Sequence, residues 1–240
     1  MRTALALLVA AAAEALVTPL PEAAFALAAQ PRARAAALAL GVANQVSYHV
    51  SLERRERSGA ASWRGTQALA RRRWTRHVFA TEGWLYAVQT LRNGITANTF
   101  LASTVLTIFT LSCGSFLGAA PAAARTRLRL AQIAGAALCL LGSAYSFSQS
   151  ARLMTHAGFM FPVAADCDGG DVCDLDDAAL SRTIVENVVV RSHRLQWSGW
   201  RYLYLSSGVG AWVVGGEYAA LAVSLALSAF FAREDRCPSL

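Results

Sequence analysis

The sequence predicts an all-α integral membrane protein, a four-helix bundle with interfacial amphipathic helices. Hydrophobic residues make up 55% of the 240 residues, and the mean hydropathy is +0.37. Charged residues make up 15%, whereas soluble domains carry about 25%. The stretch 97–120 contains no charged residue, and about 20 apolar helical residues are enough to cross the roughly 30 Å hydrocarbon core of a bilayer.

Residues 1–34 are predicted to form an N-terminal targeting-like or extra helical segment. A run of mainly alanine, leucine and valine covers 3–17 behind Arg2, and Pro19 and Pro21 follow it. Two interpretations fit this pattern: a secretory or organellar signal that is cleaved, and a short helix that is retained.

The membrane domain is predicted to cover 35–232, followed by a tail at 233–240. Its first span, at about 35–52, ends near Tyr48 and His49. The other three spans are predicted at about 93–120, 130–150 and 202–231. The sequence leaves open whether this is a membrane of the secretory pathway, an organellar membrane or the bacterial inner membrane.

Arginines and interleaved tryptophans dominate the segment that follows the first span. This pattern is typical of a helix at the headgroup boundary, although an ordinary solvated loop would also fit. Anionic lipid headgroups are predicted to bind at four arginines: Arg71, Arg72, Arg73 and Arg76. The positive-inside rule places 53–92 on the cytoplasmic-equivalent side, and four spans then place the C-terminus on the opposite side.

A polar collar precedes the second span and a polar face runs along it. Gln89, Arg92 and Asn93 are predicted to be anchored inside the protein, because an arginine at a membrane edge needs partners or must reach the interface. The polar face has helical spacing and consists of Thr96, Thr99, Ser103, Thr107 and Thr110. Such hydroxyl groups join membrane helices to one another, or else line a hydrated solute path.

Glu217 is the one acidic residue near the centre of the 202–231 span. A charged carboxylate at mid-bilayer costs about 3 kcal/mol on insertion scales, so Glu217 is predicted to face the interior and to be protonated. Arg201 lies about 24 Å away along a continuous helix and could not pair with it. Glu217 is then either a proton or cation site, or a neutral group hydrogen-bonded to a neighbouring helix.

The segment 159–200 is polar, with an acidic first half and a helical pattern after Asp177. Cys167 and Cys173 lie in the acidic half and could pair. Its aspartates depart from the pattern of a calcium loop, so no metal site is predicted. Catalytic and cofactor-binding motifs are likewise not predicted.

The net charge of +7 is attributed to the positive-inside bias, not to nucleic-acid binding.

Several motifs place the chain beside a known family. They are Tyr48-His49, Arg71-Arg72-Arg73-Trp74, the stretches 88–93 and 100–104, and Gly199, Arg201, Tyr204, Trp212 and Gly215. Over roughly 42–231 the chain resembles the domain of unknown function 599 family, uncharacterised multi-pass membrane proteins of plants and bacteria. The resemblance implies four spans and brings no known activity. The chain departs from the family pattern at Gly208, where proline is expected, and at Glu217.

The predicted role is therefore that of a non-catalytic accessory or scaffold component of a membrane or membrane complex, with membrane-protein partners. The alternative is a small-solute or proton-coupled ion transporter that uses Glu217 and the polar face of the second span. An enzyme is the third interpretation.

Overall fold

The computed structural model describes residues 30–58, 61–118, 127–166 and 182–236. This part of the chain is helical and has no strand, so the all-α prediction is confirmed. Its helices are α3 (Pro31–Arg57), α4 (Trp63–Ala80), α5 (Trp84–Gly118), α6 (Arg127–Asp166) and α7 (Arg182–Glu234). The N-terminal segment, the two loop cysteines and most of the acidic loop lie outside the described residues.

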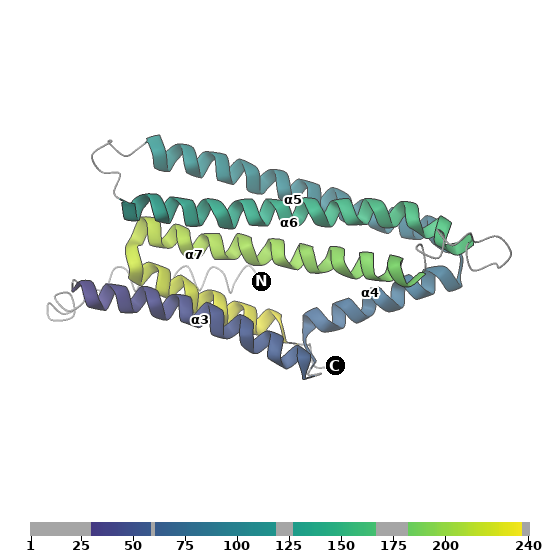
Figure 1. Cartoon of the computed structure of the whole chain (residues 1–240), viewed down its shortest axis with the longest axis horizontal. Coiled ribbons are helices and arrows are strands. Elements are labelled where there is room, and N and C mark those ends of the chain that lie inside the picture. Colours follow the sequence, from purple (N-terminus) through teal and green to yellow (C-terminus); the bar gives the residue numbers. More distant parts are fainter. Residues whose placement is uncertain (1–29, 59–60, 119–126, 167–181, 237–240) are drawn as a thin grey trace, which may run out of the picture.

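Helix α7 is a helical hairpin. Gly216 has φ 76° and ψ −165°, a combination that essentially only glycine adopts. Arg201 Nη2 lies 2.7 Å from Asp235 Oδ1, although the two residues are 34 positions apart and would be separated by about 51 Å in an unbroken helix. The second arm of α7 therefore folds back along α3 (Figure 1). The prediction of one continuous span at 202–231 is wrong, and the predicted four-helix bundle is not confirmed.

The helices are arranged in layers around α6 and the first arm of α7. Helix α6 packs between α5 and this arm, and α3 lies along the second arm, as Figure 1 shows. Helix α4 runs from the end of α3 to the start of α5. The close packing of α6 on α7 needs Gly199, because a Cβ atom there would lie 2.8 Å from the ring of Phe147.

Two apolar cores hold the layers together. One lies where α4, α5, α6 and α7 meet and includes Phe79, Met154, Phe161 and Val189. The other joins α5 to α6 through Val105, Leu140 and Phe147, with Trp200 of α7 packed against it. Burial of each such large side chain contributes about 1.5–3 kcal/mol relative to exposure.

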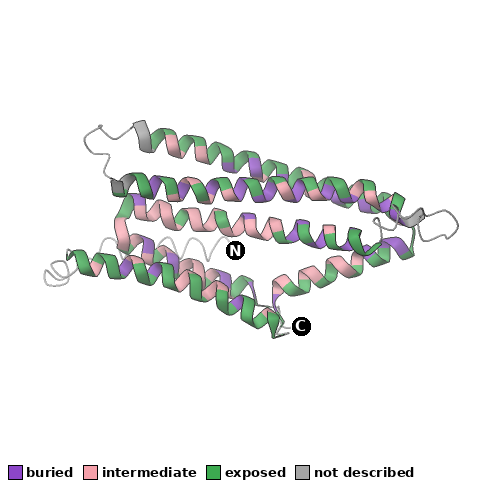
Figure 2. Cartoon of the chain, viewed as in Figure 1, coloured by how far each residue is buried: buried purple, intermediate pink, exposed green. Residues whose placement is uncertain are grey.

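The outer faces are apolar as well as exposed. Figure 2 shows exposed residues along the outer sides of all the long helices. Phe100 is 70% exposed, Leu138 70% and Val214 82%, on three different helices. Helices α5, α6 and α7 are also long and apolar enough to cross a membrane. An outer surface of this kind indicates a membrane protein, because apolar side chains are stable against lipid.

Candidate functional site

A buried ionic cluster joins α3 to both arms of α7. The Arg201 guanidinium donates hydrogen bonds from Nη2 to both carboxylate oxygens of Asp235, at 2.7 Å each. The Tyr48 hydroxyl donates to the same carboxylate. The side chains of Arg201 and Asp235 are 12% and 1% exposed. We refer to Tyr48, Arg201 and Asp235 as the Arg201 cluster.

Aromatic rings enclose the cation of this cluster. The Arg201 guanidinium carbon lies 3.8 Å from the ring centroid of Phe231 and 4.7 Å from that of Trp197. The predicted site residue His49 packs beside the cluster, with its ring centroid 5.2 Å from that of Tyr48. A cation buried between rings and opposite a carboxylate is well placed as an anchor between helices.

The start of α4 is attached to the same cluster. The Trp63 amide donates to the carbonyl oxygen of Asp235 at 3.0 Å. Ser62 caps α4, because its hydroxyl accepts from the Gly65 amide at 2.9 Å and donates to Glu56 at 2.7 Å. Arg64 donates from Nε to both oxygens of Glu56, at 2.8 and 3.0 Å. Burial alone would raise the pKa of Glu56, but the hydrogen bonds from Arg64 and Ser62 lower it.

Farther along, α4 is held to α7 by Glu186. Its carboxylate accepts from Arg72 Nη1 at 3.0 Å and from Arg76 Nε at 2.8 Å. Two of the four arginines predicted to bind lipid headgroups therefore have an intramolecular carboxylate partner. Arg71 is partly buried and Arg73 is exposed, and headgroup binding by these arginines stays a prediction.

Glu217 lies directly after the Gly216 turn, not in the middle of a span. Its carboxylate accepts from Arg34 Nε at 2.8 Å and from Nη2 at 3.2 Å. The prediction of a protonated carboxyl group without a cationic partner is therefore wrong. The reason is the hairpin, which brings the turn beside the start of α3, 183 positions earlier in the chain.

The polar collar and polar face of α5 point outward. Gln89, Arg92 and Asn93 are all exposed, and so are Thr96 and Ser103. The hydroxyls of Thr96 and Ser103 donate to the carbonyl four residues earlier, at 3.0 Å in each case. The prediction that the collar is an internal anchor is wrong, and the polar face does not join α5 to another described helix.

Two amide side chains of α3, those of Asn44 and Gln45, join helices where the polar face of α5 does not. Asn44 donates to the Ser228 hydroxyl at 2.8 Å, and Gln45 donates to the Ser224 carbonyl at 2.7 Å. Ser224 is buried and donates to the carbonyl of Gly41 at 2.7 Å. The sequence does place amides in the first apolar segment and serines in the last, but their pairing depends on the hairpin.

Among the described residues, no three histidine, cysteine, aspartate or glutamate side chains gather in a group that could hold a metal ion.

The Arg201 cluster brings together two predicted site residues, Tyr48 and Arg201, and adds Asp235, which the sequence reasoning missed. The feature of the sequence that could have indicated Asp235 is its position, as a carboxylate that follows the last apolar run.

Comparisons with curated proteins and with solved structures found no match. The family described as "Protein of unknown function, DUF599" matches residues 36–239. This range includes all five described helices except residues 31–35 of α3, and it contains the Arg201 cluster. It agrees with the resemblance seen in the motifs at 88–93 and 100–104. The chain therefore belongs to the DUF599 family of proteins of unknown function.

Proposed function

We propose that the protein is a multi-pass membrane protein with a non-catalytic accessory or scaffold role. In this arrangement α3, α5, α6 and both arms of α7 cross the bilayer, and α4 lies at the arginine-rich end. The second arm, at 217–234, has 18 residues and a length of about 27 Å, close to the thickness of the hydrocarbon core.

The observation that supports this role is that polar and charged side chains are paired with one another between helices. Glu217 is paired with Arg34, Arg201 with Asp235, and the amides of α3 with serines of α7. Each pair joins two helices or helix arms, as expected of groups that hold a fixed structure.

The transporter interpretation required Glu217 and the polar face of α5 to line one path. Glu217 lies on the α7 arm that packs along α3, whereas Ser103 is exposed on α5, on the far side of α6 and the first arm (Figure 1). The separation of these two features favours the scaffold over the transporter.

The exposed polar face of α5 is the surface on which a membrane partner can be tested. We expect a photo-crosslinking residue at Ser103, introduced into the tagged full-length chain in native membranes, to form a discrete protein adduct. The same residue at Leu138, which is exposed on α6, serves as the control and should give lipid adducts. Lipid adducts alone at both positions would contradict the scaffold role.

Purified chain in vesicles tests the transporter directly. With a pH dye inside, vesicles that contain the wild-type chain should dissipate a proton gradient no faster than empty vesicles. Faster dissipation that is lost in a variant with the charges exchanged, Arg34→Glu with Glu217→Arg, would establish the transporter instead.

A further inference from the structure

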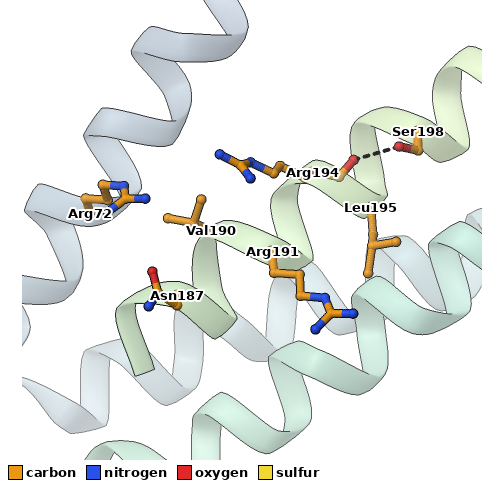
Figure 3. A pocket seen from close by; sticks show the side chains of 7 residues that line it. All are labelled: Arg72, Asn187, Val190, Arg191, Arg194, Leu195 and Ser198. Atoms are coloured by element: carbon orange, nitrogen blue, oxygen red, sulfur yellow. Dashed lines mark hydrogen bonds between the residues drawn. The ribbon is translucent and has the colours of Figure 1, made fainter. Parts of the chain in front are cut away.

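A cavity lies between α4 and the first arm of α7, and three of its seven lining residues are arginines. Its volume is about 440 Å³, within the range of small-ligand sites in proteins. Arg72 contributes one wall from α4, and Arg191 and Arg194 contribute the other from α7. Figure 3 shows the guanidinium groups of Arg72 and Arg194 extending toward each other across the opening.

The balance of charge in this cavity is positive. Three guanidinium groups line it, and one of them, that of Arg72, is paired with Glu186, a carboxylate that it shares with Arg76. Glu56 is close enough to Arg194 to have its pKa lowered by that charge, but its oxygens accept from Arg64 and Ser62. Of the three, the guanidinium groups of Arg72 and Arg194 approach each other, while that of Arg191 extends away from them (Figure 3). Like charges that approach in this way repel each other unless an anion lies between them.

The chemistry of the lining matches a phosphate group. A guanidinium presents five N–H donors in a planar fork, which suits the oxygens of phosphate. In the described part of the chain the Arg191 and Arg194 guanidinium groups have no hydrogen-bonded or ion-paired partner. Asn187 and Ser198 add neutral polar side chains, while Leu195 gives part of the wall an apolar surface.

We propose that this cavity binds a phosphate group, held between Arg72 of α4 and Arg191 and Arg194 of α7. The residues of α7 that line the cavity come before the apolar part of this helix, which begins near Tyr202. The cavity therefore lies at the arginine-rich end of the molecule. At this place the phosphate can belong to the headgroup of an anionic phospholipid or to a soluble phosphate. The inference does not depend on the scaffold role, because it rests on the cavity alone.

The test measures phosphate binding by the full-length chain. One arm uses nanodiscs with phosphatidylglycerol against nanodiscs with only phosphatidylcholine, and counts retained lipids by native mass spectrometry. The other arm titrates inorganic phosphate and glycerol phosphate into the chain in neutral detergent. Binding of the lipid alone identifies a headgroup as the source of the phosphate, and binding of the soluble anions identifies a soluble ligand.

The double variant Arg191→Gln with Arg194→Gln should weaken binding in the responding arm by about tenfold or more, because it removes two cationic hydrogen-bond donors from the cavity wall. The matched control is Arg73→Gln, which removes an exposed arginine of α4 outside the cavity and should change binding less than twofold. If the double variant does not fold, Asn187→Asp puts a carboxylate on the cavity wall with the arginines intact and should weaken binding comparably. Equal binding by the wild type and the folded variants, or an equal loss in Arg73→Gln, would overturn the proposal.

Discussion

At the scale of single residues, Asp235 connects three helices. It accepts from Arg201 and Tyr48 through its side chain and from Trp63 through its carbonyl oxygen. These three partners lie on α7, α3 and α4. Because the carboxylate is 1% exposed, its loss would leave the Arg201 cation buried without a counter-charge.

We therefore expect Asp235→Asn to lower the free energy of unfolding by about 3 kcal/mol or more, the effect of removing one partner from a buried ion pair. The measurement is the apparent Tm of the purified chain in detergent. The neighbouring substitution Glu234→Gln removes an exposed carboxylate and should change stability by less than about 1 kcal/mol. Equal effects of the two substitutions would show that the Arg201 cluster does not hold the helices.

Residue patterns identified this region only in part. Tyr48 and Arg201 were recognised as family motif residues, and both belong to the cluster. Glu217 was assigned the wrong surroundings, because its partner Arg34 is 183 positions away and only the turn of α7 brings the two together. A single apolar stretch gives no indication of whether it continues or reverses at a glycine.

At the scale of elements, α4 depends on the contacts at its first turn. Ser62 caps the helix and also binds Glu56, which is held by Arg64. The pKa of Glu56 lies below its unfolded value of 4.5. A carboxyl group of this kind stabilises the folded state above its unfolded pKa, and this stabilisation is lost as the pH falls through its folded pKa.

The lowered pKa of Glu56 leads to a prediction of how Glu56→Gln changes the dependence of stability on pH. The wild-type chain should lose stability as the pH falls below about 4.5, and the variant should be less stable at neutral pH but show a smaller loss on acidification. Because Glu56 is partly exposed, the effect should be on the order of 1 kcal/mol or less. The measurement is Tm as a function of pH, with Glu53→Gln as the control, since the Glu53–Arg57 pair is exposed. The same pH slope for wild type and Glu56→Gln would contradict the assignment.

Sequence periodicity was reliable for the existence of the elements and less so for their ends. The arginine-rich helix and the helix after Asp177 appear as α4 and the first part of α7. Helix α5 begins at Trp84, nine residues before the predicted span at 93, directly after a turn in which Glu82 has φ 51°. Hydropathy marks where lipid can surround a helix, and a helix continues beyond that point wherever other helices pack against it.

At the scale of the whole molecule, the hairpin changes which end of the helix bundle holds the last described residues. Four spans would put the C-terminus opposite the arginine-rich segment. With the second arm of α7 folded back, Asp235 instead lies beside Trp63 at the start of α4. The gross class of the protein was therefore predictable from composition, whereas its topology was not, because one glycine decides it.

This arrangement predicts the labelling of single cysteines in a cysteine-free chain. Ser58→Cys and Arg236→Cys should react with a membrane-impermeant maleimide from the same side of sealed vesicles. Gln30→Cys, at the start of α3, should react from the other side. Labelling of Ser58→Cys and Arg236→Cys from opposite sides would contradict the hairpin and restore a continuous last span.

The pairing of α3 with the last arm of α7 also sets the order in which the protein can be completed during its synthesis. Asn44 and Gln45 find their serine partners 179 to 184 positions later in the chain. At a translation rate of about 5–20 residues per second, α3 waits about 10 to 40 s for that arm to be made. During this time its amides have to bind water, headgroups or an insertion factor. The first described helix is thus among the last to reach its final contacts, and a chain released early from the ribosome would leave these two amides without their serine partners.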